Sequence, residues 1–336
     1  MKTLRTALGL AALSLVVPAL TACGDDGPTL VIYNAQHEQL LDEIAPAFEK
    51  ETGINVELRN GSDLELSNQL VQEGDATKAD VFLTENSPAM SQVEAAGLLA
   101  ALPSATLDKI PADYRPPSGD WTGFVARSTV LVYNTDDVEE SDLPASILDL
   151  ADPAWDGKIC FSPTGADFQA IVAAVLEIEG EDATKQWLEG IKANGTTYDG
   201  NNVVLESVNS GECEVGIVYH YYWARDRAES GDVSDHSAQY YFGDQDPGAF
   251  VSVSGAGVLD SSDMKKEAQQ FVDFLVSEKG QQIIADSYAL EYPLNPAVSL
   301  DDDNVKPFKQ LQPPPVNVSD LDAKAVVDLL TEVGFL

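Results

Sequence analysis

The stretch GFVARSTVLVYNTDDV, residues 123–138, shows how the chain is organised. It is rich in β-branched residues, and it lies between two regions in which strand and helix patterns alternate. A run of this kind suits a segment that crosses from one lobe of a protein to another. A second such run, GAFVSVSGAGVL, covers residues 248–259. Two extended crossings between two α/β units predict a hinged molecule with a cleft between its lobes.

The regions on either side of residues 123–138 both have the pattern of a parallel sheet covered by helices. Upstream, apolar runs that read as strands alternate with segments of helical spacing, and the same pattern restarts downstream. We therefore predict an α/β fold of two doubly wound sheets. A first lobe would contain residues 28–127 and 252–300, and a second lobe residues 128–251 and 301–336. The expected strands are 29–35, 54–61, 79–85, 158–163 and 213–219; the expected helices are 38–53, 63–74, 167–180, 181–195, 201–212, an amphipathic pair within 262–288, and 319–334.

The first 22 residues have the pattern of an export signal. A basic start, MKTLR, precedes a short apolar stretch and then LTAC, which ends at Cys23 and resembles a bacterial lipobox. The resemblance implies cleavage before Cys23 and lipidation of its thiol. The alternative is an ordinary secretion signal with an incidental cysteine. We expect an extracytoplasmic protein that is anchored to the cell membrane by lipid and is otherwise a soluble monomer.

The net charge of the 336-residue chain is −37, and such a surface disfavours nucleic acid and anionic lipid as partners. Two cysteines remain beyond the signal, Cys160 and Cys213, and each lies near the start of a predicted strand. Outside the cytoplasm an even pair favours a disulfide. The alternative is two buried free thiols.

Polar side chains follow the predicted strands at their carboxyl ends, where ligands of open α/β sheets bind. His37 follows the first strand, Glu85 ends the third, and Tyr219, Tyr221 and Tyr222 lie at the end of the last strand of the second lobe. Each signal alone is weak, because tyrosines in a strand often belong to the core. Tyr221 and Tyr222 can share a side only if a helix begins near Tyr221, and the sequence WARDRAES permits that.

Ferric iron is the ion that best suits this set of donors. A phenol loses its proton at neutral pH only beside a strong Lewis acid. Fe³⁺ with Glu85, Tyr221 and Tyr222 as anions and His37 neutral is balanced in charge. Four protein donors leave two octahedral positions for water or a small anion. The neighbouring His220 is not expected to be a ligand.

These residues resemble those of the bacterial ferric-ion-binding periplasmic proteins, the substrate-binding components of ABC iron importers. The motifs YNAQHE, ADVFLTEN, ARSTVLVYN, PTGADFQ and YHYYW occur in the order and approximate spacing of that family, over nearly the whole mature chain. The resemblance implies a type II periplasmic binding protein fold that closes around iron, and an ABC permease with its ATPase as partners. It places the iron ligands on His37, Glu85, Tyr221 and Tyr222.

The chain departs from the members of that family that bind phosphate together with iron. The loop that would hold the anion contains Thr164, Gly165 and Ala166 and is followed by Asp167, an acid that disfavours an anion unless it points away. Asn201 keeps one expected asparagine, and Tyr219 replaces another, either as a fifth ligand or as a donor to a ligand oxygen. Arg127 is expected to counter negative charge or to hold carbonate, or else to be a surface residue of the hinge. Any synergistic anion is therefore expected to be carbonate rather than phosphate.

Two other classes of function fit parts of the pattern. A binding lipoprotein of the same fold for an organic cation, such as thiamine or a polyamine, would stack its tyrosines on the ligand. A redox enzyme with phenolate-bound iron is disfavoured, because tyrosinate stabilises ferric over ferrous iron. The common catalytic motifs are absent from the sequence. The letters SDMK, residues 262–265, match the S-x-x-K pattern of a catalytic serine, but the companion motifs of that pattern are missing. We therefore expect a carrier and not an enzyme.

Overall fold

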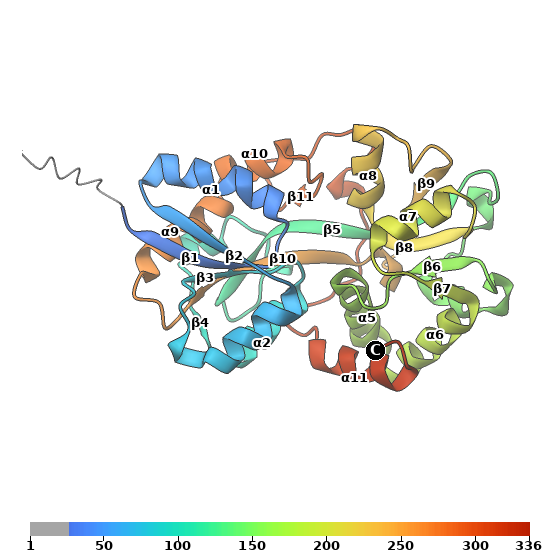
Figure 1. Cartoon of the computed structure of the whole chain (residues 1–336), viewed down its shortest axis with the longest axis horizontal. Coiled ribbons are helices and arrows are strands. Elements are labelled where there is room, and N and C mark those ends of the chain that lie inside the picture. Colours follow the sequence, from blue (N-terminus) through green and yellow to red (C-terminus); the bar gives the residue numbers. More distant parts are fainter. Residues whose placement is uncertain (1–26) are drawn as a thin grey trace, which may run out of the picture.

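The computed structural model describes residues 27–336, and its strands form two α/β lobes that share one continuous path of hydrogen-bonded strands (Figure 1). The strand order along this path is β2-β1-β3-β10-β5-β8-β6-β7, with β4 beside β10 and both β9 and β11 beside β5. The predicted signal peptide and Cys23 lie outside the described residues. None of the helices in the described part is long and apolar enough to cross a membrane.

The first lobe is built around the parallel strands β1, β2 and β3, as the sequence predicts. Helix α1 buries Leu40, Leu41, Ile44 and Phe48 and ends at Gly53, whose φ of 73° gives the left-handed cap that glycine adopts without strain. Helix α2 begins after Ser62, whose side chain accepts the amide of Glu65. The elements are β1 (Thr29–Asn34), α1 (Glu38–Thr52), β2 (Asn55–Asn60), α2 (Asp63–Glu73), β3 (Val81–Leu83), α3 (Ser87–Ala95), β4 (Leu99–Ala100) and α4 (Ser104–Leu107).

The second lobe repeats this arrangement with β6 parallel to both β7 and β8. The chain switches from strand to helix after Tyr219, so that Tyr221 and Tyr222 lie in the first turn of α8. The switch near Tyr221 that the sequence allows is therefore present. The elements are β6 (Ile159–Phe161), α5 (Ala166–Glu179), α6 (Glu181–Asn194), β7 (Gly195–Thr197), α7 (Asn201–Asn209), β8 (Val215–Tyr219), α8 (His220–Glu229) and β9 (Ser237–Tyr240).

Two long strands join the lobes, as predicted, and both run across the middle of Figure 1. Strand β5 (Trp121–Asn134) is buried along its whole length. Its first half pairs with β10 (Val251–Leu259) and its second half with β8, so a single strand belongs to both sheets. This geometry explains why residues 123–134 show no break in their β pattern; the predicted crossing runs four residues past the end of β5, into the turn at residues 135–137.

The C-terminal part of the chain adds a third connection between the lobes. Helices α9 (Lys265–Leu275) and α10 (Glu278–Asp286) form the predicted pair and lie in the first lobe with β11 (Tyr292–Pro293). Helix α11 (Ala323–Val333) packs on α5 and α6 of the second lobe. The segment between them passes from one core to the other, since Leu311 packs in the first and Leu321 in the second. The lobe boundaries drawn from the sequence stay a prediction.

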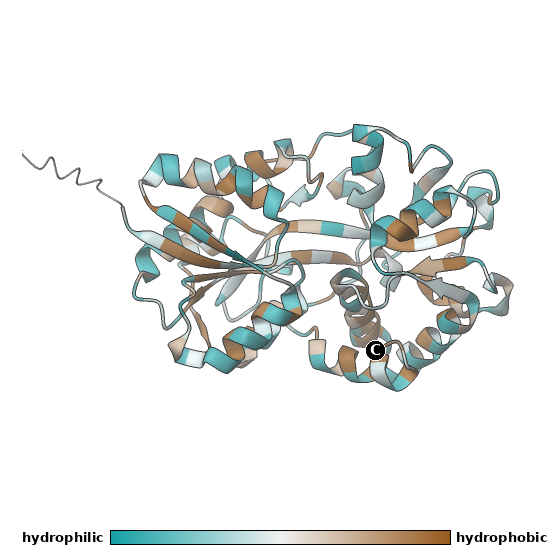
Figure 2. Cartoon of the chain, in the orientation of Figure 1, coloured by the Kyte–Doolittle hydropathy of each residue, from teal (hydrophilic) through white to brown (hydrophobic). Residues whose placement is uncertain are grey.

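Each lobe has its own apolar core. The first is centred on β1, β3 and β10 and includes Phe48, Phe82, Trp121 and Phe271. The second surrounds β6 and β8 and includes Phe161, Phe168, Trp187 and Ile217. In Figure 2 helices α1 and α2 alternate between hydrophobic and hydrophilic segments along their length, as expected for helices with one face on a core.

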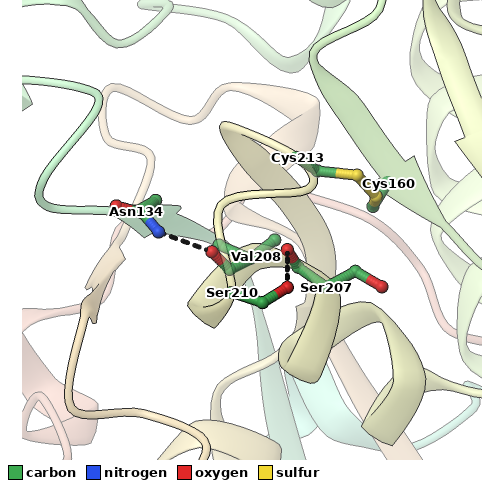
Figure 3. Close-up of a disulfide and its surroundings, with 6 residues drawn as sticks. All are labelled: Asn134, Cys160, Ser207, Val208, Ser210 and Cys213. Carbon is green, nitrogen blue, oxygen red and sulfur yellow. Dashed lines mark hydrogen bonds between the residues drawn. A yellow bond between two sulfur atoms is a disulfide. The ribbon is translucent and has the colours of Figure 1, made fainter.

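A disulfide joins Cys160 of β6 to Cys213, two residues before β8, with the two Cα atoms 5.9 Å apart (Figure 3). The neighbouring positions Cys160 and Gly216 are paired across β6 and β8. The two cysteines therefore lie at the same end of adjacent strands, which is the arrangement the sequence predicts.

Candidate metal centre

The predicted donor residues all lie where a strand gives way to a helix. His37 directly precedes α1 after β1, Glu85 lies between β3 and α3, and Tyr221 and Tyr222 follow β8. Strands β1, β3 and β8 therefore direct their carboxyl ends toward one place from the two lobes, as open α/β sheets do at a ligand site. The sheet topology, rather than any local motif, brings these side chains together.

The four predicted donor side chains are in contact across the cleft. The Nε2 atom of His37 lies 3.5 Å from Oε1 of Glu85, and the Tyr221 hydroxyl lies 3.4 Å from the same oxygen. The rings of His37 and Tyr221 meet edge to face with centroids 5.4 Å apart. The ring centroids of Tyr221 and Tyr222 lie 4.2 Å apart. One imidazole, one carboxylate and two phenols thus meet at one point.

Asp167 is also part of this cluster, although it was not predicted to be a donor. Its Oδ2 atom lies 3.0 Å from the Tyr222 hydroxyl and 3.4 Å from the Tyr221 hydroxyl. The amides of Asn86 and Asn201 donate to its two oxygens at 3.2 and 2.9 Å. The side chain is buried and lies in the first turn of α5, where the helix dipole favours an anion.

The loop expected to hold an anion surrounds this carboxylate. Gly165 precedes α5, Ala166 begins it, and the Thr164 carbonyl accepts a hydrogen bond from Gln169. Asn201 begins α7 and donates to Asp167 as described above. The amino ends of α5 and α7 thus converge on the Asp167 carboxylate itself.

Tyr219 contacts two residues of the cluster, Asn86 and Asp167. It is fully buried, and its hydroxyl lies 3.2 Å from Oδ1 of Asn86 and 3.3 Å from the backbone oxygen of Asp167. Both neighbours are acceptors for the single hydroxyl proton: Asn86, whose amide donates to Asp167, and the backbone of Asp167 itself. Of the two roles predicted for Tyr219, these contacts favour the supporting one.

Arg127 is fully buried, so it is not a surface residue of the hinge. Its Nε donates to Oε2 of Glu291 at 3.1 Å, one terminal nitrogen donates to Ser254, and the other to the backbone oxygen of Glu85. The guanidinium therefore fixes the loop that carries Glu85. Asp63 holds the same loop by accepting the amides of Glu85 and Asn86 at 2.9 and 2.8 Å.

Without a cation, the cluster holds several acidic groups close together, and their pKa values are raised. Burial and then the nearby Asp167 carboxylate raise the pKa of Glu85 well above its usual range. Burial raises the pKa of Asp63 to about 7. The same two causes, burial and Asp167, raise the pKa values of Tyr221 and Tyr222. A multivalent cation among these groups would favour all of the anionic forms at once.

Comparison with known proteins identifies the family. A model of the family described as bacterial extracellular solute-binding protein matches residues 76–313. The chain belongs to this family. A relative named Fe(3+)-binding periplasmic protein, from Serratia marcescens, is 48% identical over 330 residues, which cover 98% of this chain and 97% of the relative. The major ferric iron-binding protein of Neisseria meningitidis serogroup B is 37% identical over 335 residues, with 99% and 98% covered.

Solved structures of solute-binding proteins share the fold. Iron-bound HitA from Pseudomonas aeruginosa superposes with a TM-score of 0.85 at 42% identity, covering 92% of this chain and all of that one. A Trichodesmium protein (IdiA, FutA), in complex with iron and citrate ligands, gives 0.81 at 28% identity, with 92% and 100% covered. These neighbours confirm the predicted type II periplasmic binding protein fold.

Two further side chains of this solute-binding protein border the cluster. The Arg225 guanidinium lies 4.5 Å from the centroid of the Tyr221 ring and 5.5 Å from that of Tyr222. Both ring nitrogens of His220 are engaged, since Nε2 contacts the Leu290 carbonyl at 2.9 Å and Nδ1 the Ser128 amide at 3.2 Å. His220 therefore points away from the donors, in agreement with the expectation that it is not a ligand.

Within residues 27–336 there is no group of three or more histidine, cysteine, aspartate or glutamate side chains placed to hold a metal. The four predicted donors do not form such a group, because only His37 and Glu85 are of these residue types, and Asp167 joins them only through its contacts with the two phenols. Sequence reasoning missed Asp167 as a member, and the available signal was an acid at the start of the otherwise apolar helix predicted at 167–180.

Proposed function

We propose that this solute-binding protein binds Fe³⁺ between its lobes and delivers it to an ABC permease and its ATPase. The observation that carries the proposal is the meeting of donors from both lobes: Glu85 lies 3.5 Å from His37 and 3.4 Å from the Tyr221 hydroxyl, and the Tyr222 ring lies against that of Tyr221. Phenolate, carboxylate and imidazole together suit a hard trivalent ion, and the names of the relatives point the same way.

Asp167 takes the place of a synergistic anion in this proposal. Its carboxylate lies against both phenols, so it is placed to be the fifth donor to the ion. Fe³⁺ with Glu85, Asp167 and two phenolates leaves one negative charge, beside which Arg225 is placed as a counter-charge. Adding carbonate or phosphate would increase that negative charge. We therefore favour iron binding without an added anion over the carbonate expected from the sequence, with water at the remaining position.

The test of the function is an iron titration followed by visible absorption. Wild-type protein should develop a red to orange phenolate-to-iron band on adding Fe³⁺, because charge transfers from the two phenolates to the metal. The variant with both Tyr221→Phe and Tyr222→Phe should stay colourless. Tyr133→Phe, a buried tyrosine of β5 in the same lobe, is the matched control and should keep the band. Colour in the double variant would refute the assignment.

An organic cation is the second candidate ligand, and one observation counts against it. The Arg225 guanidinium already lies against the rings of Tyr221 and Tyr222, on which such a cation would stack. A thiamine or polyamine would have to displace that guanidinium or place a second positive charge beside it. If either compound raised the melting temperature of the iron-free protein while Fe³⁺ did not, the organic-cation function would replace the proposed one.

The same proposal includes the cellular location of the protein and its membrane anchor. We infer an extracytoplasmic carrier, without catalytic turnover, that is tethered through lipid on Cys23 and acts as a monomer. The lipobox-like sequence before Cys23 supports the tether. A Cys23→Ser variant should move from the detergent-extracted membrane fraction to the soluble fraction of cells; a variant that stayed with the membrane would argue against lipidation.

A further inference from the structure

We propose that Glu291, a residue outside the donor cluster, positions His37 for iron binding; this inference rests on the proposed function. Glu291 is fully buried and lies directly before β11. Its Oε1 accepts a hydrogen bond from Nδ1 of His37 at 2.9 Å, and its Oε2 accepts one from Nε of Arg127 at 3.1 Å. The carboxylate is thus shared between an imidazole and a guanidinium.

The contact with Glu291 decides which nitrogen of His37 is available to a metal. Because the carboxylate can only accept at this position, Nδ1 of His37 carries the proton and Nε2 keeps its lone pair. The Nε2 atom is the one that faces Glu85, at 3.5 Å from Oε1. A carboxylate behind a histidine fixes the ring orientation and makes the free nitrogen a stronger donor. His37 itself is partly exposed and makes no side-chain cap to α1, and the 2.9 Å contact with Glu291 is shorter than the 3.5 Å contact of its ring with Glu85.

Glu291 is itself held rigidly, which a positioning residue requires. Its partner Arg127 is also fully buried and donates to Ser254 and to the backbone oxygen of Glu85. The amide of Gln36 donates to Ser254 at 2.8 Å and lies 3.4 Å from Oε2 of Glu291. Arg127 therefore holds the Glu291 carboxylate against His37 and, through a separate nitrogen, holds the backbone of Glu85, whereas Glu291 itself contacts only His37 among the donors.

The same segment also contacts the helix that carries the tyrosines. The carbonyl of Leu290 accepts from Nε2 of His220, and the ring of Tyr292 stacks on His220 with centroids 4.4 Å apart. Leu290 has a φ of 52°, a left-handed conformation that leucine adopts only at a cost. Because His220 directly precedes Tyr221, residues 290–292 contact the helix that carries the tyrosines as well as His37. The segment that holds Glu291 is therefore fixed against donors of both lobes.

The test is a double-mutant cycle on iron affinity. In Glu291→Gln the amide can accept from only one of the two donors, so the proton on Nδ1 of His37 is no longer fixed. Fe³⁺ affinity, measured by competition with citrate, should fall by about 10- to 100-fold. The loss should disappear in a His37→Ala background, because Glu291 acts through His37. Glu94→Gln is the matched control, since Glu94 holds the Trp121 indole at 2.7 Å in the same lobe and makes no contact with the cluster.

Glu291→Asp is the second variant if Glu291→Gln folds poorly: it keeps a negative charge for Arg127 but shortens the side chain that reaches His37, and its loss should also vanish in the His37→Ala background. Wild-type affinity in Glu291→Gln, or a loss that adds in full to that of His37→Ala, would overturn this inference and leave the proposed function intact. A wild-type protein that bound no Fe³⁺ would overturn both.

Discussion

At the scale of single residues, the cleft shows which positions a sequence can reveal. His37 and Glu85 were predictable because each follows a recognisable strand, and carboxyl ends of strands form sites. Glu291 was not predictable, because its contact with His37 spans 254 positions and depends on how two distant segments of the chain fold into the first lobe. Asp167 lay in a quoted motif, but an acid in the first turn of a helix is usually an ordinary helix-end residue. Its role follows only from the contacts with the two phenols.

Asp167→Asn should weaken iron binding at least tenfold, since it removes a charged oxygen from beside both phenols; tenfold corresponds to about 1.4 kcal/mol. Phosphate or carbonate should then partly restore affinity, because the acid no longer repels an anion. Both effects can be measured by iron titration with and without each anion. Asp182→Asn, an acid in the first turn of α6, is the control and should have no effect. Wild-type protein that needed phosphate for tight binding would contradict the anion-free site.

At the scale of elements, most long periodic segments were predicted correctly and several short elements were missed. The predicted helices and the two crossing strands appear at the expected places, but helices α3 and α4 were not predicted. Strands β4, β7, β9 and β11 have only two to four residues each, too few to show a period of two. The lobe boundary predicted at residue 300 implies a third connection, but its proline-rich sequence gives no sign of where along it the chain passes from one core to the other. Such details depend on tertiary pairing.

Gly123→Ala should destabilise the protein, because β5 passes close to another part of the backbone there. A Cβ at this position would lie 2.5 Å from the Tyr114 carbonyl oxygen and 2.4 Å from a methyl carbon of Val253. Overpacking of this kind costs about 1–3 kcal/mol. Gly257→Ala on β10 is the comparison, since its Cβ would meet only side-chain atoms of Leu99 and Met90 at 3.0–3.3 Å. In urea unfolding of the iron-free proteins, the free energy of unfolding of Gly123→Ala should be well below that of Gly257→Ala. Equal free energies would contradict this account.

At the scale of the whole molecule, the acids of the cleft oppose closure unless a cation is present. Glu85 comes from the first lobe and Asp167 from the second, and the two lie against the same Tyr221 hydroxyl. Closing the lobes without metal buries both carboxylates together, which is why the pKa of Glu85 is raised. Iron removes that repulsion, so its binding favours the closed state.

This coupling predicts a pH dependence of shape in the iron-free protein. The raised pKa of Glu85 means that closure favours the protonated carboxyl, so the closed form is most stable below the ordinary glutamate value of 4.5. That stability is lost as the pH rises through the raised pKa. Small-angle X-ray scattering should therefore show the radius of gyration of iron-free protein increasing from acid to neutral pH, and iron should reverse the increase. An iron-free protein that kept one radius of gyration throughout would count against the coupling.

The path of the chain between the two cores also fixes when each can be completed during synthesis. The first core draws residues from Leu30 to Val318, and the second from Leu131 to Leu330. A chain that leaves a ribosome or a translocation channel in order therefore cannot finish either core until its last segments have emerged. Neither lobe is an early-folding unit, although small domains usually fold one after another from the N-terminus. Because the connections are interleaved, both cores of the nascent chain stay incomplete until nearly all of its residues have emerged.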